Sequence, residues 1–260
     1  MAWLQADDEF DADSMSRPVI GIAAELRNHD SGIHQHRMGQ LLFAASGCVR
    51  ITLARRLCML PPTRIAWIPP HTPHRAEMKD IVGYRSVWFD PRLIGSLPED
   101  VAVLDTNPLL SAVLERIALA DFAIDWQSGA NANLLAVCLD ELRVAGREPV
   151  FLRLPVDRRL RNFTGDALPP PLNELAASAG ASQKTVSRIF IQQTGMSYQH
   201  WRQQWRFLKS VELLATGNSL SFTAAELGFA SDSAFIAFFK KLSGTTPRAY
   251  IPTRPLKPVR

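Results

Sequence analysis

Residues 227–250 read LGFASDSAFIAFFKKLSGTTPRAY, and this stretch decides the fold of the C-terminal half of the chain. Leu220 to Leu227 predicts a short helix, Gly228 supplies a tight turn, and the Ser231 hydroxyl is placed to cap a second helix. The apolar positions of that helix recur at the spacing of one buried face: Phe235, Phe238, Phe239 and Leu242. The pattern predicts a helix-turn-helix unit over 220–242.

The same design occurs upstream, over 172–191. Leu172 to Ser178 predicts the first helix, Gly180 the turn, and Ser182 the cap of the second helix. In that second helix the inward positions are Val186, Ile189 and Phe190, and the outward positions are Gln183, Lys184, Ser187 and Arg188. Arginine and lysine donate to guanine edges or phosphates, glutamine pairs with adenine, and a small serine permits close approach. We interpret the outward face as a DNA-binding surface; the alternative is an ordinary solvated helix face.

A segment without glycine or proline joins the two units. It runs from Tyr198 to Thr216 and predicts a helix roughly 28 Å long at 1.5 Å per residue. That length is close to the ~34 Å between successive major-groove faces on one side of a duplex, so one chain can address two adjacent grooves. Its large apolar residues follow helical spacing and are expected in the core rather than in base stacking: Trp201, Trp205, Leu208, Val211 and Leu214.

The charge of the chain is divided unevenly. Residues 1–150 hold 14 Lys and Arg against 19 Asp and Glu, whereas residues 151–260 hold 15 against 6. A basic half attracts a polyanion, because each neutralised phosphate releases condensed counterions. The asymmetry therefore supports double-stranded DNA as the partner of the C-terminal half.

Length and composition limit the remaining classes. At 260 residues, with 47% hydrophobic and 21% charged residues, the chain is long enough for two modest domains. No apolar run approaches the length of a membrane span, and the start of the chain is acidic where a signal peptide is basic. We predict a cytoplasmic protein without a membrane partner, in which residues 1–17 are a disordered acidic segment. The cysteines lack metal-type spacing and are expected to be buried, reduced thiols: Cys48, Cys58 and Cys138.

The N-terminal half changes character near residue 100. Short β-rich runs, broken by glycine and proline, predict a small sandwich or barrel over 18–98; they are Gln40 to Phe43, Val49 to Leu53, Ile65 to Ile68 and Tyr84 to Phe89. From 108 to 147 the apolar spacing becomes helical and predicts two helices joined near Gly129, so we assign 99–150 to a helical linker and dimerisation region. Pro149 and Pro155 bracket a linker, and 156–252 is expected to be wholly helical. The fold class is therefore α+β multidomain.

The C-terminal motifs resemble one known family. The first unit carries LA at 175–176, AGAS at 179–182, TVSRIF at 185–190 and TGMS at 194–197; the second carries LGFASDSAF at 227–235, FFKK at 238–241 and GTTP at 244–247, followed by Tyr250. These motifs, over about 80 residues, resemble the AraC/XylS family of transcription regulators. The resemblance implies a DNA-binding domain of two helix-turn-helix units joined by a long helix and fused to a variable effector domain.

The chain departs from that family pattern at several positions. Tyr198 replaces the usual proline, and Thr223 replaces an aliphatic core residue. The second recognition helix exposes few hydrogen-bond donors, since its outward positions are Asp232, Ser233, Ile236 and Ala237. We therefore expect the second unit mainly to position the protein on the DNA backbone, through the N-terminus of that helix and through Lys240 or Lys241.

A second resemblance concerns the N-terminal domain. His34-x-His36, Gln40 and Gly47 resemble the first motif of cupin barrels, and PPHTPH over 69–74, ending in His74, resembles the second. In metal-binding cupins the corresponding histidines and a glutamate converge inside the barrel; here Gln40 stands in place of the glutamate. An uncharged amide is a weaker ligand for a divalent ion. We expect an effector pocket without a metal or other cofactor and substoichiometric metal in the purified protein; Zn²⁺ on the three imidazoles is the alternative.

Aromatic residues on the candidate strands complete the predicted pocket. The predicted effector-binding residues are His34, His36, Gln40, Trp67, His74 and Trp88, and Arg85 is a further candidate. Strand alternation alone does not say which face of the sheet is inside. An apolar pocket with a few polar groups is the usual form of a small-molecule site.

These observations combine into one expected function. The chain is identified as a DNA-binding transcription regulator of the AraC/XylS type, controlled by a small-molecule effector and acting as an activator or a repressor. We expect a homodimer, contact with RNA polymerase as a further possibility, and no enzymatic activity. The alternative is a metal-dependent cupin enzyme with a DNA-binding tail, in which His34, His36 and His74 hold the catalytic ion.

Overall fold

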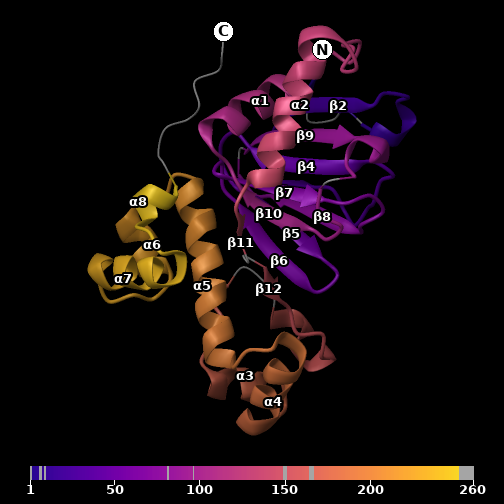
Figure 1. Cartoon of the computed structure of the whole chain (residues 1–260). Helices are drawn as coiled ribbons and strands as arrows, with labels where there is room; N and C mark the ends of the chain where they lie inside the picture. The colour runs from indigo at the N-terminus through magenta and orange to yellow at the C-terminus, as the bar shows by residue number, and fades with distance from the viewer. Residues whose placement is uncertain are drawn as a thin grey trace. The chain divides into compact units, whose positions relative to one another are not determined.

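The computed structural model describes residues 2–5, 8, 10–80, 82–95, 97–148, 151–163 and 167–251; in Figure 1 a sheet-rich part of the chain is followed by helices. Contacts divide the chain into two compact units. One consists mainly of Met1–Ile51 and Leu60–Val150, and the other of Thr52–Met59 and Phe151–Thr253. The predicted fold class, with a sheet-rich N-terminal domain and a helical C-terminal domain, is confirmed.

The larger sheet has seven strands in the order β1-β2-β9-β4-β7-β10-β11. In that order the strands are β1 (Trp3–Leu4), β2 (Val19–Leu26), β9 (Val82–Phe89), β4 (Gly39–Ala44), β7 (Arg64–Ile68), β10 (Ala102–Asp105) and β11 (Arg147–Glu148). The β1–β2 pair is parallel, and the other pairs are antiparallel. Three of the predicted β-rich runs therefore lie side by side at the centre of this sheet, as β4, β7 and β9.

The smaller sheet has five strands in the order β12-β6-β5-β8-β3. They are β12 (Leu152–Arg153), β6 (Arg56–Leu60), β5 (Val49–Leu53), β8 (His74–Met78) and β3 (His29–Asp30). Within the described ranges, short 3₁₀ helices occur at Ala12–Ser14, Pro91–Leu93 and Arg158–Phe163. Two sheets built from short strands agree with the expected barrel-like domain.

Strand register in the larger sheet separates two faces. Gln40 of β4 lies opposite Trp88 of β9, and the next residue, Leu41, lies opposite both Trp67 of β7 and Val87 of β9. Directly paired residues share a face, and successive residues alternate between faces. We call the side that carries Gln40 and Trp88 the histidine face, because the histidines described below adjoin Gln40, and the side that carries Leu41 and Trp67 the helix face.

Two helices, α1 (Pro108–Ala118) and α2 (Gly129–Val144), pack against the helix face. The Asn107 side chain caps α1 by accepting a hydrogen bond from the Leu110 backbone N–H at 2.8 Å. Of the nine apolar residues behind the helix prediction, Leu134 is partly buried against the core and Val137 is exposed. The other seven lie in one core with the sheet: Leu110, Val113, Leu114, Ile117, Leu135, Cys138 and Leu142. The spacing predicted both helices, and these seven side chains are buried within the chain rather than left for a partner.

Two segments differ from the sequence prediction. The described part of residues 1–17 is ordered: β1 pairs with β2, and the Asp13 carboxylate accepts hydrogen bonds from the backbone N–H groups of Arg37 (2.6 Å) and Met38 (3.3 Å). The region 99–150 is not purely helical, because it also contributes β10 and β11 to the larger sheet. An acidic composition predicted disorder in the first segment, but a single carboxylate that caps a loop and a short parallel strand hold it in place.

The C-terminal unit is helical from residue 172. Its helices are α3 (Leu172–Ser178), α4 (Gln183–Thr194), α5 (Tyr198–Ala215), α6 (Leu220–Glu226), α7 (Asp232–Ser243) and α8 (Pro247–Tyr250). The turn residues Gly180 and Gly228 have φ values of 58° and 71°, a region that glycine enters without strain. The α3–α4 and α6–α7 pairs lie at the two predicted helix-turn-helix units. Pro149 of the predicted linker and residue 252, the predicted end of the domain, lie outside the described residues.

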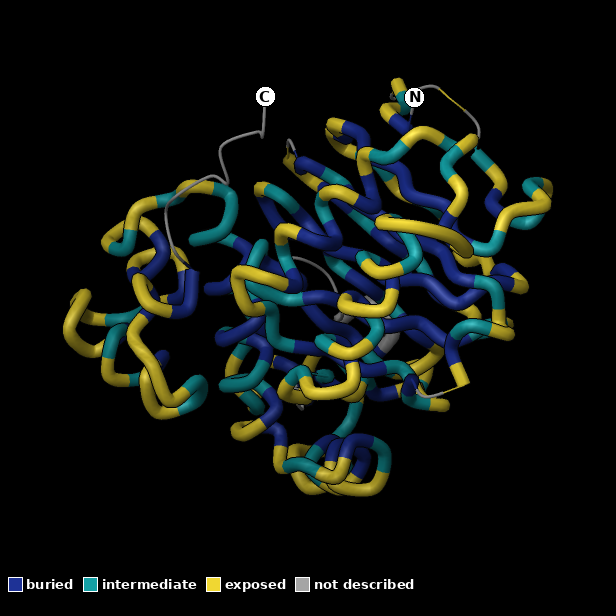
Figure 2. The backbone as a smooth tube through the Cα atoms, turned by 45° about the horizontal axis from the view of Figure 1, so that its top comes forward, coloured by how far each residue is buried: buried dark blue, intermediate teal, exposed yellow. Residues whose placement is uncertain are grey.

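Burial separates the scaffold from the outer faces (Figure 2). The strands are largely buried, whereas the helices α4 and α7 expose one side along their length. Cys48, Cys58 and Cys138 are buried and lie outside any disulfide, as predicted. Among the described residues, no helix is long and apolar enough to cross a membrane.

Candidate functional site

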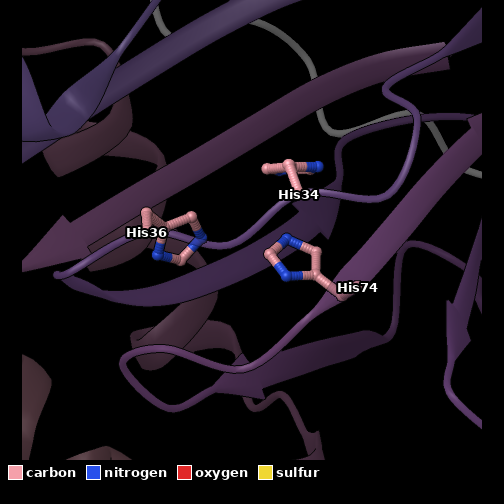
Figure 3. A group of neighbouring side chains, drawn as sticks. All are labelled: His34, His36 and His74. Carbon is pink, nitrogen blue, oxygen red and sulfur yellow. The ribbon is translucent and has the colours of Figure 1, made fainter.

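Three histidines meet at one end of the N-terminal sheets (Figure 3). His34 and His74 form an isolated antiparallel bridge, in which each backbone N–H donates to the other's carbonyl at 2.9 Å. His36 lies two residues after His34, and its ring centroid is 5.1 Å from that of His74. The ligand atoms of the three side chains all lie within 4.8 Å of one another, so the structure brings together the three histidines that the motifs singled out.

Each of these imidazoles has its Nδ1 beside a backbone carbonyl oxygen. The distances are 3.2 Å from His34 to Gly32, 2.6 Å from His36 to Met38, and 2.9 Å from His74 to Thr72. A carbonyl can only accept, so Nδ1 carries the proton and donates in all three rings. In the neutral rings the lone pair is therefore on Nε2.

His74 is the most deeply buried of the three, with 1% of its surface exposed. Its Nε2 has no hydrogen-bond partner among the described residues. Burial lowers the pKa of His74 to about 4, against a smaller opposing effect of the hydrogen bond to Thr72. His74 is therefore a neutral imidazole with a bare acceptor at neutral pH.

Gln40 lies next to the histidines on the histidine face. Its Nε2 donates to the Ser86 hydroxyl at 2.7 Å and lies 3.4 Å from the Tyr84 hydroxyl, and its Oε1 is 3.0 Å from Nε2 of His36. Burial raises the pKa of Tyr84 to about 12, so its phenol is neutral. Sequence reasoning missed Tyr84 and Ser86, although both alternate with Trp88 along β9 and thus share its face.

The two predicted pocket tryptophans lie on opposite sides of the sheet. Trp88 belongs to the histidine face, where its ring centroid is 6.3 Å from that of His36 and 5.2 Å from that of Phe10. Trp67 is buried in the core of the helix face, and its Nε1 donates to the Pro98 carbonyl at 2.7 Å. The prediction that Trp67 binds an effector beside the histidines is therefore wrong, because strand register places its side chain on the other side.

Arg85 is likewise not on the histidine face. Its guanidinium pairs with the Glu115 carboxylate of α1 at 2.9 to 3.1 Å and lies over the ring of Trp3, 5.2 Å from the centroid. Arg85 and Glu115 thus connect the sheet with α1, and they do not line the histidine cluster.

The second candidate surface is the outer face of α4. The Ser182 hydroxyl caps this helix by accepting from the backbone N–H of Thr185 at 3.1 Å, while Val186, Ile189 and Phe190 are buried as predicted. The outward residues Gln183, Lys184 and Arg188 are exposed, and Ser187 is half-buried. In the described part of the chain, neither Lys184 nor Arg188 forms an ion pair, so both cations are available to an external anion.

The corresponding face of α7 has different chemistry. Ser231 caps the helix by accepting from the backbone N–H of Ala234 at 3.2 Å, and the exposed Asp232 carboxylate accepts from the Ser221 hydroxyl at 2.6 Å. Ser233 and Ala237 are exposed, and Ile236 is half-buried. The cations of this helix, Lys240 and Lys241, are exposed in its last turn. Phe235 and Phe239 are fully buried as predicted, whereas Phe238 and Leu242 are half-buried.

Helix α5 holds both units through buried rings and donors to backbone carbonyls. Arg202 donates to the Pro169 carbonyl at 2.5 Å, just before α3, and Tyr198 donates to the neighbouring Pro170 carbonyl. Arg206 donates to the Leu227 carbonyl at 2.9 Å, in the turn after α6, and lies 4.4 Å from the ring centroid of Phe229. The buried Trp201 and Trp205 confirm that the tryptophans of this helix belong to the core, and half-buried Leu214 lies at its end.

Comparisons with known proteins agree with the division of the chain into a sheet-rich N-terminal domain and a helical C-terminal domain. An AraC-like ligand binding domain matches residues 18–126, and a helix-turn-helix domain matches residues 175–252. The chain is 27% identical over 227 residues to the HTH-type transcriptional regulator NimR of Escherichia coli K12, an alignment that covers 85% of this chain and 82% of NimR. The HTH-type transcriptional regulator RipA of Corynebacterium glutamicum is 32% identical over 102 residues, covering 37% of this chain and 31% of RipA.

Among solved structures, ToxT of Vibrio cholerae aligns over 90% of this chain and 98% of its own length, at 11% identity and a TM-score of 0.36. The chain carries a ligand-binding domain followed by a helix-turn-helix domain, and it is similar to NimR over most of both chains. Together these findings identify the family of the protein. The chain belongs to the AraC family of DNA-binding transcription regulators, with a cupin-like ligand-binding domain at its N-terminus and two helix-turn-helix units at its C-terminus.

Proposed function

We propose that this regulator reads its operator mainly through α4, and that a small-molecule effector bound at the histidine face controls its affinity for that operator. Ligand control requires that the effector bind more tightly to one arrangement of the chain than to another. Because its target is genomic DNA, we place the protein in the cytoplasm.

The observation that carries the DNA-binding part is the outer face of α4. Lys184 and Arg188 are four residues apart, so their side chains project from the same side of the helix. Both are exposed and free of carboxylate partners within the described residues. Arginine donates two hydrogen bonds to the guanine O6/N7 edge, which is the commonest specific contact in the major groove. The excess of basic residues in 151–260 favours the same role for this half of the chain.

The effector part rests on the histidine face. Three imidazoles, an amide and a phenol converge there: His34, His36, His74, Gln40 and Tyr84. Apolar surface adjoins them, because Trp88 packs with Phe10, and Phe10 in turn stacks on Phe122 at 6.1 Å. A few polar groups beside aromatic rings is the usual composition of a small-molecule site.

We infer that the chain has no enzymatic activity. The relatives that match it are named as transcriptional regulators, and this favours a sensor over a cupin enzyme with a DNA-binding tail. A search for turnover should therefore find none, whereas an effector should change DNA affinity. Contact with RNA polymerase is part of the proposal, since an activator acts through it.

We further propose that the protein is a homodimer through its first 150 residues. The apolar faces of α1 and α2 are largely buried against the sheet. Four apolar residues remain exposed on or beside these helices: Leu109, Leu119, Val137 and Val144. Sedimentation velocity at tens of micromolar should give a dimer. A strict monomer at that concentration contradicts this part of the proposal and leaves the rest intact.

DNA binding can be tested before the operator sequence has been determined. The full chain is used to select duplexes from a random-sequence pool, and the selected duplex is compared with a scrambled duplex at fixed salt. We expect tighter binding to the selected sequence and a linear fall of log affinity with log salt. A folded protein that enriches no sequence contradicts the proposal.

Effector control needs a second experiment. Small polar metabolites are screened by thermal shift, and each stabilising compound is tested for its effect on affinity for the selected duplex. A true effector should lose its effect in Trp88→Ala, which changes the histidine face, and keep it in the surface variant Val156→Ala. An effector whose action survives Trp88→Ala binds elsewhere.

A further inference from the structure

The outward face of α4 also carries an exposed apolar residue. Ile191 lies seven residues after Lys184 and three after Arg188, and 57% of its surface is exposed. At about 100° of helical rotation per residue, the three side chains project within roughly 60° of one another. Ile191 therefore belongs to the same surface as the two cations that the proposed function places against DNA.

Packing of the first unit does not account for this isoleucine. Four residues of α4 are buried: Val186, Ile189, Phe190 and Thr194. Ile191 lies on the opposite side of the helix. In α7 the residue at the same distance from the serine cap is Lys240, so the frame of such a unit accepts a cation at this position. A single exposed apolar side chain is ordinary on a protein surface, but one beside two cations on a recognition helix points to a role in binding.

The major groove offers an isoleucine one favourable contact with a base edge. The C5-methyl group of thymine is the apolar feature of that groove, whereas the other groups of the base edges are hydrogen-bond donors and acceptors. An isoleucine over those polar groups excludes water from them and leaves them unpaired, which is costly. Contact with a thymine methyl group instead buries two apolar surfaces. An isoleucine on this surface therefore discriminates in favour of thymine.

The position of Ile191 along α4 also fits a base contact. Homeodomains read the major groove through helix residues that are spaced at i, i+3, i+4 and i+7. On α4 this spacing selects Lys184, Ser187, Arg188 and Ile191. Three residues of helix rise about 4.5 Å, and successive base pairs are about 3.4 Å apart, so the bases under Arg188 and Ile191 lie within about two base pairs of each other.

We propose that Ile191 contacts the C5-methyl group of a thymine in the operator, within about two base pairs of the guanine edge to which Arg188 donates. The inference rests on the proposed function, because it needs α4 in the major groove. It goes further by giving α4 an apolar base contact, which specifies a base without a hydrogen bond. The operator segment under α4 should then contain a guanine and a neighbouring thymine.

The first experiment removes the methyl group from the DNA and leaves base pairing unchanged. The full chain selects duplexes from a random-sequence pool, and each invariant thymine of the selected duplex is replaced in turn by deoxyuridine. At one thymine the affinity of the wild type should fall roughly fourfold, as expected for one buried methyl group. In Ile191→Ala the same replacement should have no effect, because the contact is already absent. Fluorescence anisotropy at fixed salt measures both affinities.

Two further variants separate a base contact from a general loss of binding. Ile191→Val keeps a branched side chain and should retain most of the discrimination between thymine and deoxyuridine. Val156→Ala truncates an exposed aliphatic residue outside α4 and should bind both duplexes as the wild type does. Circular dichroism checks that each variant is folded, which we expect because residue 191 is exposed.

A last variant places at this position the residue that α7 has. Ile191→Lys should lose the preference for thymine over deoxyuridine and bind the scrambled duplex more tightly, since an added cation neutralises one more phosphate. The slope of log affinity against log salt should become steeper by about one. Retention of the thymine preference in Ile191→Lys contradicts the proposed contact.

The failures of the two proposals are distinguishable. A protein that enriches no sequence loses both. A protein that enriches a sequence and loses its preference in Arg188→Ala, but shows the same deoxyuridine effect in the wild type and in Ile191→Ala, keeps α4 as the DNA-reading helix and loses only the thymine contact. A selected sequence without an invariant thymine beside the guanine overturns the inference in the same way. A deoxyuridine effect that disappears in Ile191→Ala supports it.

Discussion

The two helix-turn-helix units have the same frame and different outer faces. Each recognition helix has 12 residues, starts after a serine cap and ends at a left-handed glycine, Gly195 in α4 and Gly244 in α7. Counting from the caps, Val186 corresponds to Phe235 and Phe190 to Phe239, and all four are buried. The frame thus depends on caps and on inward residues that both units retain.

The outward positions do not correspond in chemistry. Counted in the same way, Gln183 matches Asp232, Lys184 matches Ser233, Ser187 matches Ile236, and Arg188 matches Ala237. At each position where α4 has a cation or a hydrogen-bond donor, α7 has an anion, a small polar group or an apolar group. The comparison teaches that the fold and the DNA-reading capacity of a unit are set by separate sets of residues, so one can change without the other.

The largest expected effect is on operator discrimination by α4. Arg188→Ala should weaken binding to the selected duplex by about 1 to 3 kcal/mol and reduce its preference over a scrambled duplex, because a base contact is lost. Loss of a phosphate contact instead weakens both duplexes alike and lowers the salt slope by about one. Fluorescence anisotropy with both duplexes at several salt concentrations separates the two outcomes.

The control for Arg188 is the other unit. Ser233→Ala and Ala237→Ser alter the outward face of α7 and should change the ratio of the two affinities far less. If Arg188→Ala leaves that ratio unchanged while Ser233→Ala removes it, α7 is the principal reader and the comparison must be reversed.

An intermediate effect is expected for the caps, where the units should behave alike. Ser182→Ala and Ser231→Ala each remove the acceptor for a backbone N–H at the start of a recognition helix and should each lower the free energy of unfolding by about 1 kcal/mol. Denaturant unfolding followed by circular dichroism measures the free energy of unfolding. Ser233→Ala is the control, because Ser233 lies within α7 and does not cap it. A large loss in only one unit would show that the frames are not equivalent.

The smallest effect concerns a buried position that is polar in the second unit and apolar in the first. Thr223 lies five residues before the turn glycine of the second unit, the place that Leu175 takes in the first, and both are buried. The Thr223 hydroxyl donates to the Ser219 carbonyl at 2.9 Å, but that carbonyl also accepts from the Thr223 backbone N–H at 2.9 Å. Thr223→Val leaves no orphaned acceptor, so the free energy of unfolding should change by less than about 1 kcal/mol. A larger loss would show that the hydroxyl specifies the second unit.

Sequence patterns predicted the helical half more fully than the sheet half. Caps, turn glycines and helical spacing are local signals, and they located both units and the buried rings of α5. The histidines were also found, because the two motifs that contain them resemble those of cupin barrels. Trp67 and Trp88 could not be separated, since both are large residues in β-rich runs and only the pairing of β4 with its two neighbours shows that they lie on opposite faces.

Long-range contacts account for the other differences. The apolar spacing of 108–147 predicted helices correctly, but a helical stripe does not say whether it will meet a partner or its own sheet. The start of the chain was expected to be disordered from its charge, yet Asp13 contacts backbone 24 residues away. Tyr84 and Ser86 escaped notice because their role depends on Gln40 from another strand.

The length of α5 has a consequence for the DNA that this protein can recognise. Its 18 residues span about 27 Å and are tied to both units, so α4 and α7 are held at a fixed separation. Five base pairs inserted between their contacts would turn the second contact to the opposite side of the duplex. A full turn would restore the side but add about 34 Å, which one rigid helix cannot follow. An operator read by both helices is thus of fixed length, and its two segments can change in sequence but not in spacing.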